Sequence, residues 1–232
     1  MLSKNKNLIV DKMCEGSVFE SFTDPRYEIK IPLQKGQLNE FNTYIRNNSK
    51  VRLKKVYSNR KVNSIYLDDD DLSSYADNVA GISRRIKRRF RWYDNDLNSI
   101  VFENKIKKNK ASIKQSERII NKGSRPPVNR KDVRGLLHKS ISSKFFPNLE
   151  VNYQREYYEL GFGIRMTIDT EMKFRKLHPI VQSKFTSSPV YAVVEFKYSV
   201  AQSAQAKSLL SGIPFRVFRH SKYVIGMDTV CR

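Results

Sequence analysis

One ten-residue segment combines strong positive charge with the alternation of a β-strand. Residues 84–93 read Arg-Arg-Ile-Lys-Arg-Arg-Phe-Arg-Trp-Tyr, and neighbouring side chains of a strand point to opposite faces. One face then holds four cations in a row, Arg85, Lys87, Arg89 and Arg91, followed by Tyr93. The other face holds the three apolar side chains of Ile86, Phe90 and Trp92, together with Arg88 and, at its start, Arg84. Because like charges on one sheet face repel, the segment predicts a polyanionic ligand, and phosphates above all.

The composition agrees with an anionic partner. Lys and Arg number 44 against 23 Asp and Glu, which gives a formal net charge of +21. Such an excess favours association with nucleic acid, an anionic membrane surface or polyphosphate. The chain has 232 residues, of which 39% are hydrophobic and 11% aromatic. This is too apolar for a disordered basic tail, and the length suits one domain.

The cysteines and the apolar segments predict where the protein resides. Cys14 and Cys231 lie near the two ends of the sequence without the spacing of a disulfide framework, so we expect free thiols in a reducing compartment. Residues 8–10 are too short an apolar stretch for a signal peptide, and no stretch approaches the length of a membrane span. We therefore expect a soluble, cytoplasmic protein without a transmembrane segment.

Hydrophobic periodicity predicts a mainly antiparallel β fold with helices, of the α+β class. Strands are expected at 26–33, 62–68, 84–93, 99–107, 112–118, 151–160, 163–169, 190–198 and 214–218. Helices are expected at 37–47, 69–78, 129–145 and 202–211. Residues 1–24 lack sustained periodicity and are expected to form a tail or cap, whereas residues 25–232 form a single domain.

At least five of the expected strands carry both signs of charge on the face opposite their apolar residues. In three of them Glu and Lys stand two positions apart: Glu28 and Lys30, Glu103 and Lys105, and Glu195 and Lys197. An open sheet with one solvated face would explain each strand singly. A closed barrel would turn all the charged faces inward around a wet lumen and the apolar faces toward helices packed outside. We favour the closed barrel, which forms a tunnel.

A lumen of this composition is suited to phosphate chemistry with a divalent cation. Guanidinium groups bind phosphate oxygens in pairs, and lysines act as point charges. Carboxylates would repel a phosphate chain unless a divalent cation lies between them, and oxygen ligands suit Mg²⁺ or Mn²⁺. Phosphoryl transfer needs mainly positioning and charge neutralisation from the protein. The sequence offers no candidate for a covalent nucleophile.

Nine short motifs, taken in order, resemble the polyphosphate polymerase domain of the vacuolar transporter chaperone (VTC) complex. They are Glu28-Ile-Lys30, Ser64-Ile-Tyr-Leu-Asp68, Arg89-Phe-Arg-Trp-Tyr93, Glu103-Asn-Lys105, Ser112-Ile-Lys114, Tyr153-Gln-Arg155, Arg165-Met-Thr-Ile-Asp169, Glu195-Phe-Lys197 and Ser221-Lys222-Tyr223. The resemblance covers residues 25–228. That domain belongs to the triphosphate tunnel metalloenzymes, the CYTH-like superfamily, together with class IV-type adenylate cyclases, thiamine triphosphatases and inorganic triphosphatases.

The resemblance implies a closed β-barrel tunnel and an ATP-dependent polymerase. The terminal phosphate of an inorganic polyphosphate or pyrophosphate chain would attack the γ-phosphorus of ATP and release ADP. The tunnel residues expected to act in catalysis are Lys30, Arg89, Arg91, Lys105, Lys114, Arg155, Arg165 and Lys222. Further residues expected to bind the substrate are Lys87, Lys197 and Arg219. The candidate ligands of Mn²⁺ or Mg²⁺ are Glu195, Glu28 and Glu103, of which Glu28 and Glu103 could equally balance charge.

Three alternatives stay open. A triphosphatase of the same superfamily would need a base for water, but many tunnel hydrolases begin with Glu-x-Glu-x-Lys and this chain has Arg26 at the first position. A nucleic-acid-binding protein would fit the charge and the interleaved aromatic residues. However, carboxylates on the same strand faces would repel a sugar-phosphate backbone, so no nucleic-acid partner is expected. A non-catalytic polyphosphate binder would follow from an incomplete metal site. A membrane partner is not visible in the sequence.

Overall fold

The computed structural model describes residues 21–22, 25–109, 111–119, 125–177 and 183–231. Most of the expected tail or cap at residues 1–24, and Cys14 with it, lies outside these ranges. The role of that segment therefore stays a prediction.

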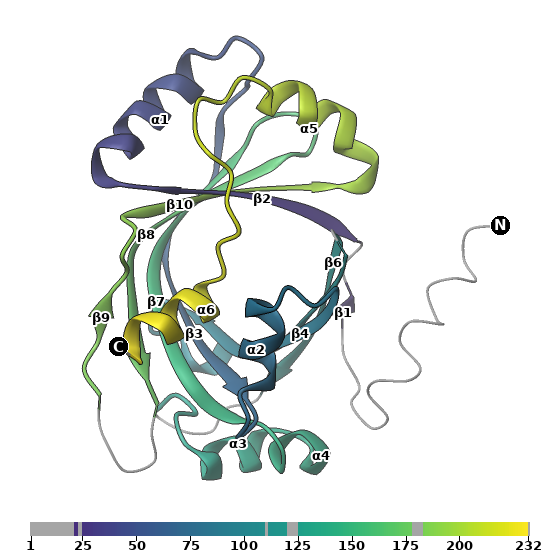
Figure 1. Ribbon diagram of the computed structural model, residues 1–232, viewed down its shortest axis with the longest axis vertical. Coiled ribbons are helices and arrows are strands. Elements are labelled where there is room, and N and C mark those ends of the chain that lie inside the picture. Colours follow the sequence, from purple (N-terminus) through teal and green to yellow (C-terminus); the bar gives the residue numbers. More distant parts are fainter. Residues whose placement is uncertain (1–20, 23–24, 110, 120–124, 178–182, 232) are drawn as a thin grey trace, which may run out of the picture.

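Within the described residues, eight strands pair edge to edge into a closed antiparallel ring (Figure 1). Their order around the ring is β2 (Arg26–Leu33), β10 (Ala192–Ser199), β8 (Arg165–Lys176), β7 (Phe146–Glu159), β3 (Lys54–Asp68), β4 (Arg84–Tyr93), β5 (Ile100–Lys108) and β6 (Ala111–Ile119). The ring closes where Arg26 of β2 pairs with Ser112 of β6. Two short strands add to it, β1 (Ser21–Phe22) beside β6 and β9 (Thr186–Ser187) beside β8. The closed tunnel expected from the strand faces is confirmed.

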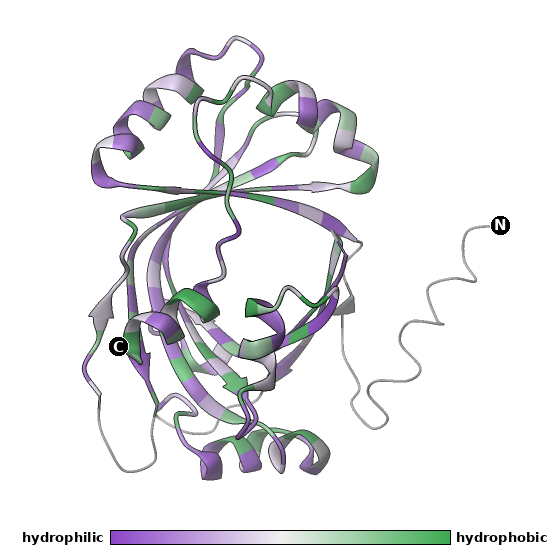
Figure 2. Ribbon diagram, viewed as in Figure 1, coloured by the Kyte–Doolittle hydropathy of each residue, from purple (hydrophilic) through white to green (hydrophobic). Residues whose placement is uncertain are grey.

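Helices cover the apolar outer face of the ring on two sides. The helices α1 (Lys35–Asn47) and α5 (Ser203–Leu210) pack on β2, β10 and β8, and α3 (Arg130–Leu136) and α4 (Lys139–Ser142) lie on the opposite side (Figure 1). Phe41 of α1 and Phe196 of β10 are fully buried in the first contact, and each such side chain stabilises the fold by about 1.5–3 kcal/mol. Along the strands, hydrophilic and hydrophobic residues alternate (Figure 2).

The C-terminal helix α6 (Lys222–Val230) lies against the inner face of the ring. Its Tyr223 and Met227 are buried among inner-face residues of β7 and β8, such as Leu149 and Phe174. The helix approaches these strands so closely that a Cβ at Gly226 would lie 2.6 Å from Leu149 Cδ2 and 2.8 Å from Phe174 Cδ1. Part of the lumen is therefore filled by an apolar helix. Periodicity did not predict this helix.

Asp68, at the end of β3, joins α6 to the neighbouring helix α2 (Ser73–Val79). Its carboxylate is fully buried and accepts hydrogen bonds from the backbone N–H groups of Ser74 and Tyr75, both at 2.9 Å. It also accepts a hydrogen bond from the Tyr223 hydroxyl at 2.5 Å. These bonds hold the starts of both helices at one side of the ring opening.

Three expectations about secondary structure are wrong in detail. Residues 214–218 do not form a strand; the segment 211–221 runs without strand pairing from α5 to α6 across the ring opening (Figure 1). The helix expected at 129–145 is two short helices, separated at Leu137 and His138. The strand expected to begin at residue 151 begins at Phe146 and includes Pro147, which lies opposite Leu67 at an irregularity of the pairing, where a strand tolerates proline.

Besides β7, two other strands are longer than expected. β3 begins at Lys54 and β8 continues to Lys176. β8 passes through Glu171, whose φ of 53° lies beside a register shift of the β7–β8 pairing. Such a bulge changes the direction of the side chains on either side of it. The two-residue period is therefore broken there, and a prediction from alternation places the end of the strand too early.

Candidate functional site

The basic strand β4 points its cations into the lumen, as the alternation predicted. Phe90 and Trp92 are buried on the outer face in contact with the cluster that α3 covers. Their burial fixes the direction of the intervening side chains, because neighbours on a strand alternate. Arg89 therefore lies between Tyr66 of β3 and Glu103 of β5 in the sheet, and Arg91 lies opposite Ser64.

Glu103 forms the first group of ion pairs in the lumen. Its Oε2 lies 2.6 Å from Arg89 Nη2 and 3.7 Å from Arg91 Nη1, and its Oε1 lies 3.1 Å from Lys114 Nζ. Burial alone would raise the pKa of Glu103, but the three cations outweigh burial and hold this pKa well below its usual range. Glu103 is thus an ionised group enclosed by positive charge.

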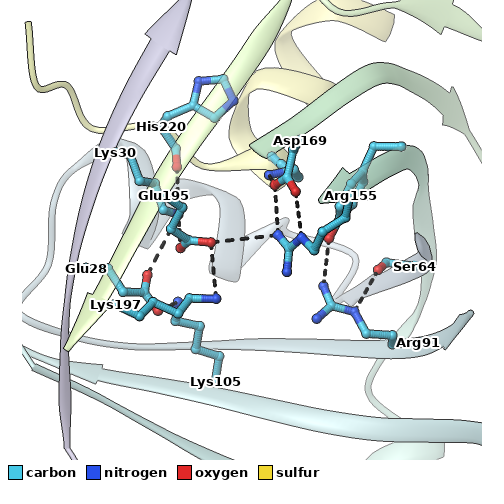
Figure 3. A network of polar contacts seen from close by, with 12 residues as sticks. Glu28, Lys30, Ser64, Arg91, Lys105, Arg155, Asp169, Glu195, Lys197 and His220 are labelled. Carbon is cyan, nitrogen blue, oxygen red and sulfur yellow. Dashed lines mark hydrogen bonds and ion pairs between the residues drawn. The ribbon is translucent and has the colours of Figure 1, made fainter. Parts of the chain in front are cut away.

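Glu28 and Glu195 form the second group, on neighbouring strands (Figure 3). Lys30 Nζ lies 3.8 Å from Glu28 Oε2 and 3.4 Å from Glu195 Oε1. Lys105 pairs with Glu28, and Lys197 Nζ lies 3.1 Å from Glu195 Oε2. Burial opposes ionisation of both carboxyl groups, but the lysines lower the pKa of Glu28 to about 2 and that of Glu195 well below its usual value.

Asp169 of β8 holds the third group. Its side chain is fully buried, and its two oxygens lie 2.5 Å from Arg155 Nε and 2.7 Å from Arg155 Nη2. Lys222 Nζ, at the start of α6, lies 2.5 Å from Asp169 Oδ2. Both cations also face the ring of Tyr153, at 5.1 Å for Arg155 Cζ and 4.7 Å for Lys222 Nζ. Asp169 thereby fixes the positions of two lumen cations.

Three cavities follow one another along the lumen. The mouth cavity, of about 360 Å³, lies beside the segment that crosses the opening and is lined by residues such as Glu28 and Arg219. The central cavity has a volume of about 70 Å³, and the far cavity, of about 260 Å³, is lined by residues of β4, β5 and β6 such as Glu103 and Lys114. The first two share four lining residues: Lys30, Lys87, Lys105 and Ser221. The last two share Arg91. The lumen therefore contains a series of neighbouring cavities whose lining is strongly cationic.

The structure brings nearly all of the predicted site residues to these cavities. The cations that line them are Lys30, Lys87, Arg89, Arg91, Lys105, Lys114, Arg155, Lys197, Arg219 and Lys222. The three carboxylates Glu28, Glu103 and Glu195 line them as well. Arg165 differs: it lies on the inner face opposite Lys197, but it is exposed at the start of β8 and lines none of the three cavities. The roles of these residues stay predictions.

Sequence reasoning missed several hydroxyl groups of the site. The Tyr66 hydroxyl accepts a hydrogen bond from Arg89 Nη1 at 3.0 Å, and the Tyr153 hydroxyl accepts one from Arg91 Nη2 at 3.2 Å. Ser221 Oγ accepts a hydrogen bond from Lys87 Nζ at 2.7 Å. The alternation of β3 could have predicted that Tyr66 faces the lumen, because Tyr66 lies two positions after Ser64 and therefore on the same inner face. The position of Ser221 depends on α6, which periodicity did not reveal.

The carboxylates allow a test of the expected divalent cation. The described residues contain no group of three or more Asp, Glu, His and Cys side chains arranged to hold a metal ion by themselves. Glu28 and Glu195, both ionised, face one lysine from adjacent strands. Mg²⁺ is commonly held by one or two carboxylates together with phosphate oxygens. Because two carboxylates lie on adjacent strands here, the pair fits a cation that binds together with a phosphate substrate. Among the described residues, Glu103 has no second carboxylate paired to the same cation, and both Glu103 and Glu195 are paired with three cations.

Two further findings concern the ends and the helices of the described chain. Cys231 is exposed and forms no disulfide within the described residues. None of the helices in those ranges combines the length and the apolar character that crossing a bilayer requires.

Solved structures share this fold at low sequence identity. A putative adenylyl cyclase from Hippeastrum, described as having a dominant triphosphatase activity, is 12% identical with a TM-score of 0.52, over 89% of this chain and 96% of that chain. A protein from Pyrococcus horikoshii OT3 is 13% identical with a TM-score of 0.51, over 88% and 98%. A putative adenylate cyclase from Vibrio parahaemolyticus is 8% identical with a TM-score of 0.52, over 87% and 97%.

Comparison at the level of sequence gives the family. No curated protein matches the chain. The VTC domain matches residues 25–231, which include every strand of the closed ring and every cation of its lumen described above. The tunnel fold and its ordered charged motifs thus agree with the sequence match, and this chain belongs to the VTC domain family.

Proposed function

We propose that this protein is an ATP-dependent polyphosphate polymerase. It transfers the γ-phosphate of ATP to a growing chain of inorganic polyphosphate, or to a pyrophosphate primer, and releases ADP. The observation that carries the proposal is the series of three neighbouring cationic cavities in a chain of the VTC domain family. A long anionic product needs such cavities, because each of its phosphates must remain neutralised as the chain lengthens.

The lumen cations are held in place before the substrate arrives. Arg89, Arg91 and Arg155 are each fixed by a carboxylate and a tyrosine, and their side chains are only 9–16% exposed. Charges prepared in this way stabilise a transition state without reorganising during the reaction. Two unit charges 4 Å apart interact by about 4 kcal/mol at an effective dielectric constant near 20. Several such contacts offset the repulsion between a triphosphate and an anionic acceptor.

These cavities also support an in-line geometry for transfer. The central cavity shares lining residues with the mouth cavity and with the far cavity, so a donor and an acceptor would approach it from opposite sides. Holding both reactants in line supplies much of the rate enhancement in phosphoryl transfer. The terminal phosphate of the acceptor is already anionic, so elongation requires no general base.

Glu28 and Glu195 would hold Mn²⁺ or Mg²⁺, which when bound neutralises charge on the phosphoryl oxygens. Lys30 lies between the two carboxylates and its pKa is raised, because burial, which lowers it, is outweighed by Glu195 and Glu28. Lys30 therefore remains charged and sets the position of both carboxylates. Lys105 and Lys197, on either side, orient the remaining carboxylate oxygens.

A triphosphatase is the second candidate. The Hippeastrum structure, which shares the fold, is described as having that activity. Hydrolysis requires a group that activates water, but the carboxylates of the lumen are each paired with cations and their pKa values are lowered. A lowered pKa makes a carboxylate a weak base, so the lumen carboxylates are poorly suited to activate water, whereas an acceptor that is already anionic needs no base from them.

The test is to incubate the full chain with ATP, Mn²⁺ and pyrophosphate, and to separate the products by size on a urea gel. We expect a ladder of phosphate chains together with ADP. Free phosphate without chains would instead identify a triphosphatase. Tripolyphosphate binding without turnover would indicate a non-catalytic binder, and binding of single-stranded nucleic acid in preference to tripolyphosphate would favour the nucleic-acid alternative.

A further inference from the structure

Lys87 differs from every other cation of the central cavity. Within the part of the chain that the structure describes, the other seven each form an ion pair with a carboxylate: Lys30, Arg89, Arg91, Lys105, Arg155, Lys197 and Lys222. Lys87 has no such pair among those residues and instead donates a hydrogen bond to Ser221 Oγ at 2.7 Å. A lysine directed at a hydroxyl group, rather than at a carboxylate, is the arrangement that activates serine nucleophiles.

The surroundings of Lys87 favour its neutral form. Burial lowers the pKa of Lys87, and the neighbouring cations Lys30, Lys105 and Arg85 lower it further. Glu28 raises it, but the cations and burial outweigh Glu28 and keep the pKa well below its usual value. Lysine can lose its proton under such conditions, whereas arginine does not. The Lys87 amine is thus suited to accept a proton from the hydroxyl that it contacts.

Ser221 stands at the boundary between the mouth cavity and the central cavity, which it lines together with Lys87. It is also the N-cap of α6, where its Oγ accepts a hydrogen bond from the Val224 backbone N–H at 3.4 Å. Lys30 Nζ lies 3.0 Å from the backbone oxygen of the preceding residue, His220. A phosphate on Ser221 would therefore meet a helix N-terminus and several cations, all of which stabilise a dianion.

We propose that Ser221 is itself the first phosphate acceptor of the tunnel and that Lys87 takes up its proton. This inference rests on the proposed function only in taking a nucleoside triphosphate as the donor. Ser221 Oγ forms a bond to the γ-phosphorus, and its proton passes to Lys87 Nζ. The bond between the γ-phosphorus and the oxygen that bridges to the β-phosphorus breaks, and the nucleoside diphosphate leaves with that electron pair. The resulting phosphoserine ends in an anionic phosphate and can accept the next phosphoryl group without a base.

The first experiment incubates the full chain with ATP and Mn²⁺, without any primer, and measures the intact mass and the modified peptide. We expect phosphorylation at Ser221, and none when a non-hydrolysable ATP analogue replaces ATP. Ser221→Ala and Ser221→Asn should both abolish it. The asparagine variant keeps a side-chain acceptor for the helix N-terminus, so its loss of labelling cannot be due to a missing cap. Ser208→Ala, an exposed serine of α5 outside the tunnel, is the matched control and should label as the unsubstituted chain does.

Lys87→Arg tests the proton transfer. Arginine keeps the positive charge but does not accept a proton at accessible pH. We expect the rate of Ser221 phosphorylation to fall by about 100-fold or more, the usual contribution of a general base. We also expect the rise of this rate with pH, present in the unsubstituted chain, to disappear. Labelling by this variant at the original rate, with the same pH profile, would overturn the assignment of Lys87.

A parallel reaction with pyrophosphate separates this inference from the proposed function. Chains formed from pyrophosphate without any phosphoserine would overturn the inference and leave the polymerase intact. Phosphoserine at position 221 without chains would support the inference and remove the polymerase. Phosphorylation at another serine, such as Ser64 in the lumen, would overturn the choice of Ser221. Absence of both products would reject both proposals.

Discussion

The lumen has two halves, both lined by the same strands: one half is apolar and filled, and the other is charged and contains cavities. The apolar half is formed by inner-face residues of β7, β8 and β10 and is filled by α6: Leu149, Val151, Met172, Phe174 and Val193 pack with Tyr223 and Met227. The charged half continues along these strands with Arg155, Asp169 and Glu195 and stays open as cavities. The difference shows that alternation decides which face is inside, whereas the side chains along that face decide whether it is filled or wet.

The two halves meet at the first turn of α6. Tyr223 anchors the helix in the apolar half, stacked on Tyr66 with ring centroids 5.1 Å apart. One residue earlier, Lys222 reaches Asp169 in the charged half. The apolar half therefore acts as the support that fixes a cation of the site. Changes in the charged half should alter the charge of the site directly, whereas changes in the apolar half should reach the site only through the position of α6.

The largest effect on stability is expected within the charged half, at Asp169→Asn. This change leaves Arg155 and Lys222 without their shared carboxylate, and breaking a buried ion pair on one side costs about 3–5 kcal/mol. Equilibrium denaturation of the variant measures the cost. Added tripolyphosphate should restore part of the stability, because its oxygens replace the lost negative charge.

Asp70→Asn is the matched control for Asp169. Asp70 is 73% exposed and pairs with Arg130 at 2.7 Å on the surface, where such pairs contribute at most about 1 kcal/mol. If both variants lose the same free energy of unfolding, the buried ion pairs of Asp169 contribute no more than the surface pair of Asp70. The charged half would then not be a cluster of mutually stabilising buried ions.

Arg91→Ala should lower the rate of chain synthesis by about 100- to 1,000-fold, the usual loss for one charge-stabilising group. Arg91 lines both the central and the far cavity, so its removal takes a positive charge from the boundary between them. The fold should persist, because Glu103 retains Arg89 and Lys114. Circular dichroism and the yield of chains on a urea gel measure the two properties separately.

Arg88→Ala removes the same charge from the outer face of the same strand, where Arg88 stacks on the ring of Phe145 at 3.9 Å. It should leave chain synthesis within a few-fold of the original rate. Unfolding of Arg91→Ala with unchanged turnover of the folded fraction would mean that the faces of β4 have been assigned wrongly.

Tripolyphosphate with Mn²⁺ should stabilise the fold more than AMP does, because it fills a lumen in which like charges otherwise repel. At a concentration 100 times the dissociation constant, the gain is about 2.7 kcal/mol, which raises Tm by about 5–10 °C for a chain of this size. Differential scanning fluorimetry at low and high salt measures the shift, which should shrink as salt screens the charges. A Tm indifferent to tripolyphosphate would reject the anion-binding lumen altogether.

The strand faces of the charged half could be predicted from sequence because their cause is local. In β4, Phe90 and Trp92 are buried outside and thereby turn Arg89 and Arg91 inward, all within one strand. Which carboxylate each cation pairs with depends on the register of strands that are far apart in the sequence, and alternation does not predict this register. For the same reason alternation could not predict that Lys87, within the described residues, pairs with no carboxylate. The same limit explains Arg165, which has the correct face but lies at an exposed strand end.

The apolar half was largely invisible to sequence reasoning. Residues 222–230 of α6 are apolar at most positions around the helix, so no amphipathic period marks them, and only the closed ring creates the site in which such a helix is buried. The neighbouring segment 214–218 alternates like a strand, but it crosses the opening and contacts β2 through one backbone bond, from Phe218 N–H to Lys30 O at 3.0 Å. In both segments, contacts with distant parts of the chain, rather than the local pattern, determine the secondary structure.

The smallest effect is expected in the apolar half, at Gly226→Ala. The added methyl would meet Leu149 and Phe174 at distances that force the helix or the strands to move, which costs about 1–3 kcal/mol. Gly36→Ala in α1, where nothing lies within 4 Å of the new carbon, should instead be neutral or stabilise by up to about 1 kcal/mol. Because α6 carries Lys222 and Ser221 at its start, the Gly226 variant should also bind tripolyphosphate more weakly, although it changes no charge. Lower stability with unchanged affinity for tripolyphosphate would show that the two halves are independent, and that α6 fills the lumen without positioning its charged end.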